Sequence, residues 1–177
     1  MRRRRPAALV LLLLLLLGGC GFHPLYASAQ NGAAGPAASG LAAIAVGQIP
    51  DRTGQLLRLA LQERFERSGL ALAHLYDLNV TFSLSTEGIA IQTDTSNARV
   101  RVVGTATYQL IAQDPDRRTL TSGTARSMDG LNVFDQQPFA ADLETEVVQQ
   151  RVAEAVADEI TQQLAIYFDG QPALAAR

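Results

Sequence analysis

The sequence predicts an α+β fold, a two-layer sandwich in which two helices pack on one face of a four-stranded sheet. Between residues 77 and 127, apolar and polar residues alternate with a period of two in three consecutive segments. This is the pattern of strands with one buried and one solvated face. Apolar residues recur at helical spacing both before and after these strands. With one more apolar, β-branched segment near residue 44, the predicted order is β-α-β-β-β-α.

The first 19 residues predict a cleaved secretory signal peptide. Four arginines at 2–5 precede an unbroken apolar run at 7–17, and a basic segment followed by an apolar one is typical of such signals. A helix of eleven residues spans roughly 16 Å, which is too short for a hydrocarbon core of ~30 Å. The run is followed by Gly18, Gly19 and the chain's only cysteine, Cys20.

The sequence that ends at Cys20 resembles a bacterial lipobox, whose cysteine is acylated and becomes the first residue of the mature protein. The alternative is an ordinary signal with a chance cysteine, but the tight spacing and the lack of any other cysteine favour the lipobox. We therefore expect a covalent N-acyl diglyceride on Cys20, and no other cofactor. Two or more acyl chains hold a protein stably on a bilayer. By resemblance to lipoprotein sorting in Gram-negative bacteria, Gly rather than Asp at position 21 favours the outer membrane.

The segment after Cys20 predicts a flexible tether, because residues 27–40 contain only Ala, Ser, Gly, Asn, Gln and Pro and bury little apolar surface. The chain then divides into a signal peptide (1–19), an acylated tether (20–40), a folded domain (41–170) and a tail (171–177). Cleavage removes 19 of 177 residues and four of 15 arginines, which leaves 158 residues with eleven arginines against 17 acidic residues. This net charge of −6 argues against nucleic-acid binding.

The folded domain begins with a predicted strand and helix. Residues 43–49 are apolar and β-branched, and Pro50 ends the strand. Residues 54–68 predict a helix, for which Thr53 is a suitable N-cap and Gly69 a C-terminal stop. The apolar stripe of this helix consists of Leu56, Leu57, Ala60, Leu61 and Phe65.

Three strands and a long helix complete the domain. The strands are predicted over 77–85, 99–112 and 118–127, as an antiparallel meander with one polar face left open. The helix is predicted over 138–168, with Pro138 in its first turn. Its apolar stripe consists of Val148, Val152, Val156, Ile160, Leu164 and Tyr167.

The sequence offers few residues for catalysis or metal binding. One cysteine excludes an intramolecular disulfide framework and a thiolate zinc cluster. The two histidines, His23 and His74, lie far apart, and we interpret both as ordinary polar residues. The chain has no Gly-rich phosphate loop and no nucleophile elbow. These observations predict a protein that is not an enzyme and has no metal site.

Five arginines are candidate contacts for an anionic ligand or partner. Two lie on the polar face of the second predicted meander strand, and three lie at the start of the third strand or along it. Guanidinium groups bind phosphate and carboxylate bidentately, although a solvated sheet face that discourages edge aggregation is the simpler interpretation. The five are Arg99, Arg101, Arg117, Arg118 and Arg126.

Four features together match the pattern of a known lipoprotein family. They are the lipobox followed by CGFHPLY at 20–26, the sequence PDRTGQ at 50–55 before a helix, the strand at 99–110, and the terminal helix that ends LAIYF at 164–168. In these features the chain resembles the LptE family of LPS-assembly lipoproteins, most of all its alphaproteobacterial members. It departs from typical members in its long Ala/Gly linker and its lack of lysine.

The resemblance implies a non-enzymatic function in the outer membrane. Such lipoproteins sit inside a large outer-membrane β-barrel, help it assemble, plug it and assist delivery of LPS to the outer leaflet. The implied partners are therefore this barrel, LPS and the membrane that holds the lipid anchor, with the domain facing the periplasm or the barrel lumen. In the family, basic residues contribute to LPS binding, so the resemblance makes the five arginines candidate contacts with LPS or barrel.

Two other function classes are compatible with the residues. One is a lipoprotein accessory subunit of an ABC-type envelope lipid-transport system, which would co-purify with a periplasmic lipid-shuttling complex. The other is an envelope hydrolase, which would need an acid–base pair converging in a pocket.

Overall fold

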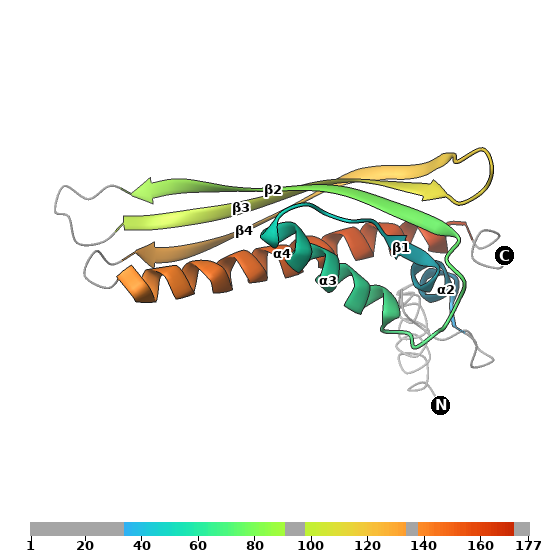
Figure 1. The fold of residues 1–177 in the computed structure, drawn as a ribbon, viewed down its shortest axis with the longest axis horizontal. Coiled ribbons are helices and arrows are strands. Elements are labelled where there is room, and N and C mark those ends of the chain that lie inside the picture. Colours follow the sequence, from blue (N-terminus) through green and yellow to red (C-terminus); the bar gives the residue numbers. More distant parts are fainter. Residues whose placement is uncertain (1–33, 91–97, 134–137, 172–177) are drawn as a thin grey trace, which may run out of the picture.

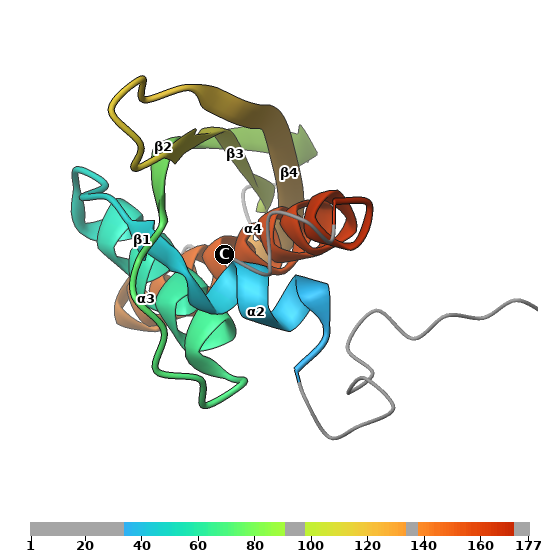
Figure 2. The same cartoon turned by 90° about the vertical axis from the view of Figure 1, so that its right-hand side faces the viewer.

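The computed structural model describes residues 34–90, 98–133 and 138–171. One sheet has the strand order β1-β2-β3-β4, with β1 parallel to β2 and the other pairs antiparallel. Within the described residues, three helices lie on one side of this sheet (Figure 1, Figure 2). The predicted two-layer α+β fold is therefore confirmed, with one more helix than predicted. The elements are α2 (Pro36–Ala42), β1 (Ile44–Val46), α3 (Arg52–Glu66), β2 (Tyr76–Ala90), β3 (Ala98–Ala112), β4 (Thr119–Val133) and α4 (Pro138–Asp169).

The hairpin of β2 and β3 extends further than the hydrophobic alternation predicts. The alternation weakens after Leu84, yet β2, which is 15 residues long, continues to Ala90. The pairing reaches Arg99 opposite Ala90, after a register shift near Gly88. Backbone hydrogen bonds alone are enough to continue an antiparallel ladder. The β2 half of this hairpin end therefore forms without the alternating side-chain pattern on which the prediction relied, whereas the β3 half keeps it, with Val100 and Val102 packed in an apolar cluster with Val148 and Val152.

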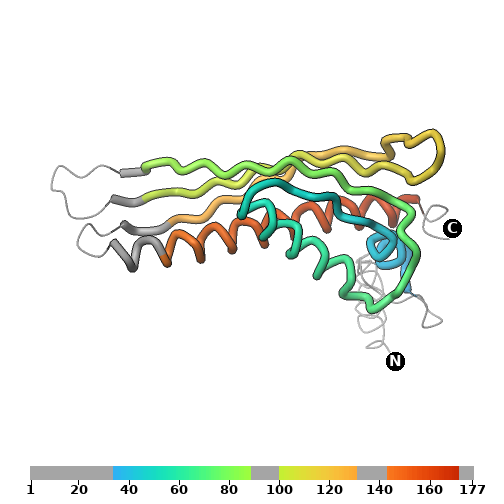
Figure 3. Tube along the Cα trace, viewed as in Figure 1, coloured from blue at the N-terminus to red at the C-terminus, as the bar shows by residue number. Residues whose placement is uncertain are grey.

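Helix α4 runs lengthwise along the inner face of the sheet, beneath β3 and β4 (Figure 3). The predicted stripe from Val148 to Leu164 is fully buried, but Phe168 rather than the half-buried Tyr167 ends it. Close packing depends on Gly104 of β3, because a Cβ there would collide with the side chain of Val152. The helix begins at Pro138, as predicted.

Helix α3 begins differently from the prediction. Its N-cap residue is Asp51 rather than Thr53, with a left-handed φ of 68° and no side-chain cap hydrogen bond. Instead, the Gln55 side-chain amide donates to the carbonyl oxygen of Ile49 at 3.0 Å. This contact between helix and preceding loop fixes the entry of the chain. Gly69 follows the helix end with a φ of 66°, which agrees with its predicted role as a stop.

Part of the predicted tether belongs to the folded domain. Residues 36–40 lie in α2, where Ala37 is 1% exposed. Gly40 packs on the ring of Phe168, where any Cβ would collide. The small residues of α2 therefore allow this helix to pack closely on α4, and they do not form a flexible linker. The domain begins at or before Pro36 instead of Leu41, while the predicted signal peptide, Cys20 and residues 172–177 lie outside the described residues.

Strand β1 is much shorter than the strand predicted at 43–49. Only Ile44–Val46 pair with β2, opposite Tyr76–Leu78. One further hydrogen bond joins the Gly47 N–H to the Leu78 carbonyl oxygen at 2.9 Å. The chain then leaves the sheet and passes through Pro50 into α3. Pro50 has no N–H and could not have donated to a longer ladder. Beyond Leu78, no other described strand pairs with this edge of β2.

Candidate functional site

The sheet face opposite the helices is open (Figure 2), and its exposed side chains are mostly polar, as predicted. Its exposed side chains are mostly hydroxyl groups on three adjacent strands. A hydroxyl group both donates and accepts hydrogen bonds, so this face suits a polar partner or a polar ligand. The exposed hydroxyl residues include Thr81, Ser83 and Ser85 of β2, Thr107 of β3, and Ser122 and Thr124 of β4.

Two of the five candidate arginines lie on this open face. Arg101 of β3 is half-buried and lies opposite Glu87 of β2 in the ladder. Arg126 of β4 is exposed and lies opposite Thr105 of β3. Arg101 and Thr105, the residue opposite Arg126, are four positions apart along β3, which is roughly 13 Å of strand. One ligand or one partner surface can therefore contact both guanidinium groups.

An apolar pair lies between these two cations. Val103 of β3 and Met128 of β4 are register partners on the open face. Val103 is almost fully buried, whereas Met128 is 52% exposed. An exposed thioether is polarizable and adapts to irregular apolar surfaces. Arg101 and Arg126 can thus bind the negative groups of an amphipathic anion while Met128 contacts its apolar part.

Arg117 and Arg118 lie in the turn between β3 and β4, where each contacts a carboxylate of this chain. The Arg117 Nη2 atom is 2.9 Å from Asp77 Oδ2, and Arg117 itself has a left-handed φ of 44°. Arg118 Nη2 lies 3.0 Å from Asp114 Oδ2, and this hydrogen bond lowers the pKa of Asp114 and raises that of Arg118. Both guanidinium groups thus have intramolecular partners.

The five arginines do not form one cluster. Arg101 is eleven residues from Ala112 at the other end of β3, a distance of roughly 36 Å along an extended strand. The turn with Arg117 and Arg118 therefore lies at the opposite end of the sheet from Arg101. Arg99 lies opposite Asn132 in the ladder, and its side chain is outside the described residues.

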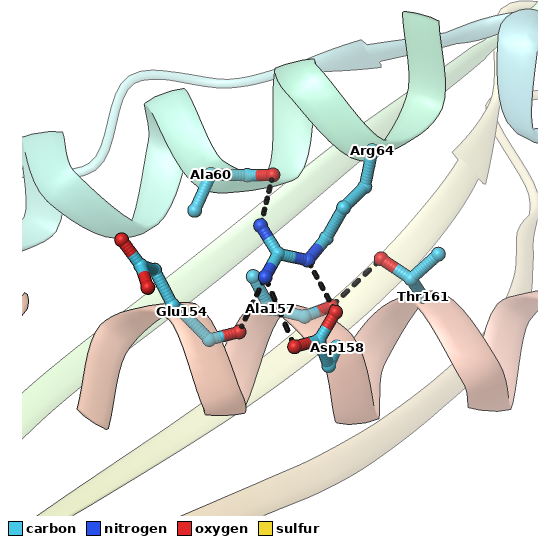
Figure 4. A network of polar contacts seen from close by, with 6 residues as sticks. All are labelled: Ala60, Arg64, Glu154, Ala157, Asp158 and Thr161. Carbon is cyan, nitrogen blue, oxygen red and sulfur yellow. Dashed lines mark hydrogen bonds and ion pairs between the residues drawn. The ribbon is translucent and has the colours of Figure 1, made fainter. Parts of the chain in front are cut away.

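Sequence reasoning missed one arginine that joins two helices. Arg64 of α3 donates to both carboxylate oxygens of Asp158 on α4, at 2.6 and 3.0 Å (Figure 4). It also donates to the backbone carbonyls of Ala60 and Glu154, at 3.0 and 3.1 Å. The hydrogen bond raises the pKa of Arg64 and lowers that of Asp158. No local signal reveals this contact, because 94 residues separate the two partners.

We expect Asp158→Asn to destabilise the protein at neutral pH and to have little effect in acid. The loss at pH 7 should be about 1 kcal/mol or less, because the carboxylate is 66% exposed and solvent screens the pair. Since folding depresses the pKa of Asp158 below its ordinary 3.8, its stabilising contribution disappears as pH falls through that depressed value. Urea unfolding of the wild type and variant at about pH 7 and pH 2 checks this.

The matched control for this experiment is Glu66→Gln, an exposed acid on α3. It should leave the unfolding free energy within about 0.5 kcal/mol at either pH. An Asp158→Asn variant as stable as the wild type at pH 7 would contradict a stabilising role for the ion pair.

Of the two histidines, only His74 lies in the described part of the chain. Within the described residues, no three His, Cys, Asp or Glu side chains are grouped as metal ligands. His74 is exposed in the segment between α3 and β2. Among the helices of the described ranges, none is long and apolar enough to cross a membrane.

The family model for lipopolysaccharide assembly, LptE, matches residues 41–164. This chain belongs to the LptE family. The match extends from the residues before β1 into the last turns of α4, so it includes the whole sheet. It confirms the family predicted from the sequence resemblance. A search of curated protein sequences finds no match.

Three solved structures share the LptE fold of this chain. A candidate lipoprotein from Caulobacter crescentus CB15 is 22% identical, with a TM-score of 0.58, over 76% of this chain and 97% of its own. A minor lipoprotein from Acinetobacter baumannii is 16% identical, with a TM-score of 0.56, over 70% and 90%. Rare lipoprotein B from Shewanella oneidensis is 15% identical, with a TM-score of 0.54, over 70% and 93%. At these identities the likeness is one of fold.

Membership of the LptE family gives this chain a general role in LPS assembly, as a lipoprotein of the outer membrane. The family is non-enzymatic and associates with the machinery of LPS transport. The matched residues include Arg101 and Arg126 on the open sheet face and the turn with Arg117 and Arg118. Cys20 lies before the matched segment.

Proposed function

We propose that this protein helps assemble, and plugs, the large outer-membrane β-barrel that translocates LPS, and that it assists delivery of LPS to the outer leaflet. The observation that carries the proposal is the LptE match over residues 41–164. The lipobox pattern that ends at Cys20 supports it. So does an architecture in which helices cover one sheet face and leave the other open (Figure 1), with exposed side chains that are mostly polar.

In this proposal, Cys20 carries the acyl chains that anchor the protein. Two or more such chains give stable membrane attachment, whereas one gives only marginal binding. The anchor holds the domain at the inner leaflet of the outer membrane. Gly rather than Asp at residue 21 supports the choice of membrane, by resemblance to lipoprotein sorting in Gram-negative bacteria. The domain then faces the periplasm or the lumen of the barrel.

The open sheet face is the surface that fits the barrel lumen or LPS. Wide outer-membrane barrels have polar interiors, which match the exposed hydroxyl groups of β2, β3 and β4. Arg99, Arg101 and Arg126 contact phosphate or carboxylate groups, and Met128 contacts an apolar part of the same ligand or partner. Arg117 and Arg118 contribute less in this proposal, because they must exchange their present carboxylate partners.

Extraction of the mature lipoprotein in mild detergent tests the proposed function. A large heat-modifiable barrel is expected to co-purify with the wild type, together with LPS. The double reversal R101E/R126E should reduce the recovery of LPS or barrel by about tenfold, which corresponds to about 1.4 kcal/mol. Like charges that face an anionic ligand repel it, so the effect has a physical cause.

The matched control is R52E/R67E, which changes the net charge equally but on exposed positions of the helix layer. It should leave the recovery of both partners unchanged. If R101E/R126E recovers as much barrel and LPS as the wild type, these arginines are not contacts. Recovery of a periplasmic lipid-shuttling complex in place of a barrel would overturn the function itself.

A further inference from the structure

Strand β2 has a long edge without a partner in the described part of the chain. The last hydrogen bond on that side joins Gly47 N–H to the Leu78 carbonyl oxygen. In a strand, the N–H and C=O groups of one residue point to the same edge, and those of the next residue to the opposite edge. Residues in phase with Leu78 therefore direct their backbone groups outward. They are Val80, Phe82, Leu84 and Thr86.

The opposite edge of the sheet is protected. On β4, the carbonyl oxygen of Thr124 accepts a hydrogen bond from the Gln163 side chain of α4 at 3.3 Å. Asp129 of β4 pairs with Arg151 of α4 at 3.1 Å, so a charge faces the helix layer. Covering helices and inward charges are devices that prevent edge-to-edge pairing. Residues 79–86 of β2, by contrast, include no charge, no proline and no glycine, and their pairing with β3 has no bulge.

We propose that residues 79–86 of β2 receive an extended segment of a partner protein as an additional strand beside β1. The N–H and C=O groups along this edge alternate at strand spacing, so the backbone of another extended strand can pair with them. Phe82 and Leu84 are only partly buried, so inward-facing side chains of the added strand are apolar. Its outward-facing side chains are polar, like Ser83 and Ser85 beside them.

The occupant is a different protein rather than a second copy of this chain. Two copies meeting edge to edge would share only these eight residues each, whereas stable dimers use about 20–30 residues a side. A segment of a larger partner gains further contact from its own fold. This proposal goes beyond the proposed function, because neither LPS nor a barrel enters the argument.

Site-specific photo-crosslinking of the full lipoprotein in cells tests the proposal. A photoreactive residue at Ser83, exposed on the edge strand, should give one adduct with a defined segment of another protein. The same residue at Glu66, exposed on helix α3 and away from the open sheet face, serves as the reference. An adduct with the mass of two copies of this chain would establish a homodimer and overturn the proposal, as would an adduct no stronger than the Glu66 reference.

Two proline variants separate strand addition from side-chain contact. Thr86→Pro removes one outward N–H from an exposed residue on the β2 edge, and Ser122→Pro does the same on β4. Thr86→Pro should reduce the Ser83 adduct at least about tenfold, while Ser122→Pro should leave it unchanged. An adduct that survives Thr86→Pro in a protein folded like the wild type contradicts strand addition.

Amide hydrogen exchange supplies a readout that needs no variant. In the lipoprotein alone, the outward amides of Phe82, Leu84 and Thr86 should exchange quickly, and those of Ser83 and Ser85, which face β3, slowly. In the complex with the cross-linked partner, the first set should slow by about tenfold or more. Unchanged exchange at those three amides would show that no strand has been added.

Discussion

Replacement of Cys20 by serine is expected to remove the protein from the outer membrane. The anchor in the proposed account consists of acyl chains on this residue, and serine lacks the sulfur that carries the diglyceride. Without the chains, no described helix can span a bilayer in their place. The amount in the washed outer-membrane fraction should fall at least about tenfold, since stable attachment requires at least two lipid chains. Membrane fractionation and intact-mass measurement of the protein check this result.

Two further variants make the anchoring result specific. Ser28→Ala changes the segment after the anchor and should leave both mass and location unchanged. Gly21→Asp should give an acylated protein that stays at the inner membrane. A Cys20→Ser protein that remains in the outer membrane in wild-type amounts would show that the attachment does not depend on acylation.

Truncation of Phe168 to alanine is expected to lower the free energy of unfolding by about 3–5 kcal/mol. Its ring is fully buried near the end of α4. The Tyr76 ring lies 5.3 Å away, centroid to centroid, and Gly40 of α2 packs directly on the Phe168 ring. The deletion therefore removes the contact that joins α2 and β2 to α4. Urea unfolding of the lipoprotein in detergent, followed by circular dichroism, measures the change.

Ile166→Ala is the matched control for the Phe168 experiment, because Ile166 is 55% exposed on the same helix. Its effect should lie within about 0.5 kcal/mol. A loss of under about 1 kcal/mol for Phe168→Ala would contradict the packing of α2 and β2 against the end of α4.

The periodicity of apolar residues along the sequence identified most of the helices and strands correctly. The stripe from Val148 to Leu164 predicts both the helix and its buried side, and the alternation after Asp77 predicts the antiparallel meander with an open polar face. Such patterns are readable because burial selects the side chains directly. Strand ends are less readable, since β2 continues to Ala90 on backbone pairing after the side-chain pattern stops.

Helix α2 was not predictable from its composition. Ala, Ser and Gly at 37–40 are residues that a flexible linker and a close helix contact both require. Only the position of Phe168, about 130 residues later in the chain, distinguishes the two. The same holds for Asp51, whose left-handed φ at the start of α3 depends on the loop before it.

The candidate site was predictable as a face but not as a set of contacts. Strand alternation placed Arg101 on the polar side of the sheet, whereas the position of Arg126 on that side comes from the register of β4 against β3. Alternation does not show which side chains pair with each other. The ion pair between Arg117, in the turn after β3, and Asp77 of β2 therefore appears only in the structure. The free edge of β2 is likewise invisible in the sequence, because it depends on how early β1 turns away.

The proposed function includes assisting delivery of LPS to the outer leaflet. Depletion of the protein in cells, followed by measurement of LPS accessible to an impermeant probe at the cell surface, tests it most directly. Surface LPS is expected to fall to a small fraction of its normal amount, and re-expression of the wild-type chain is expected to restore it. Surface LPS that stays at its normal amount after depletion would contradict the proposed function.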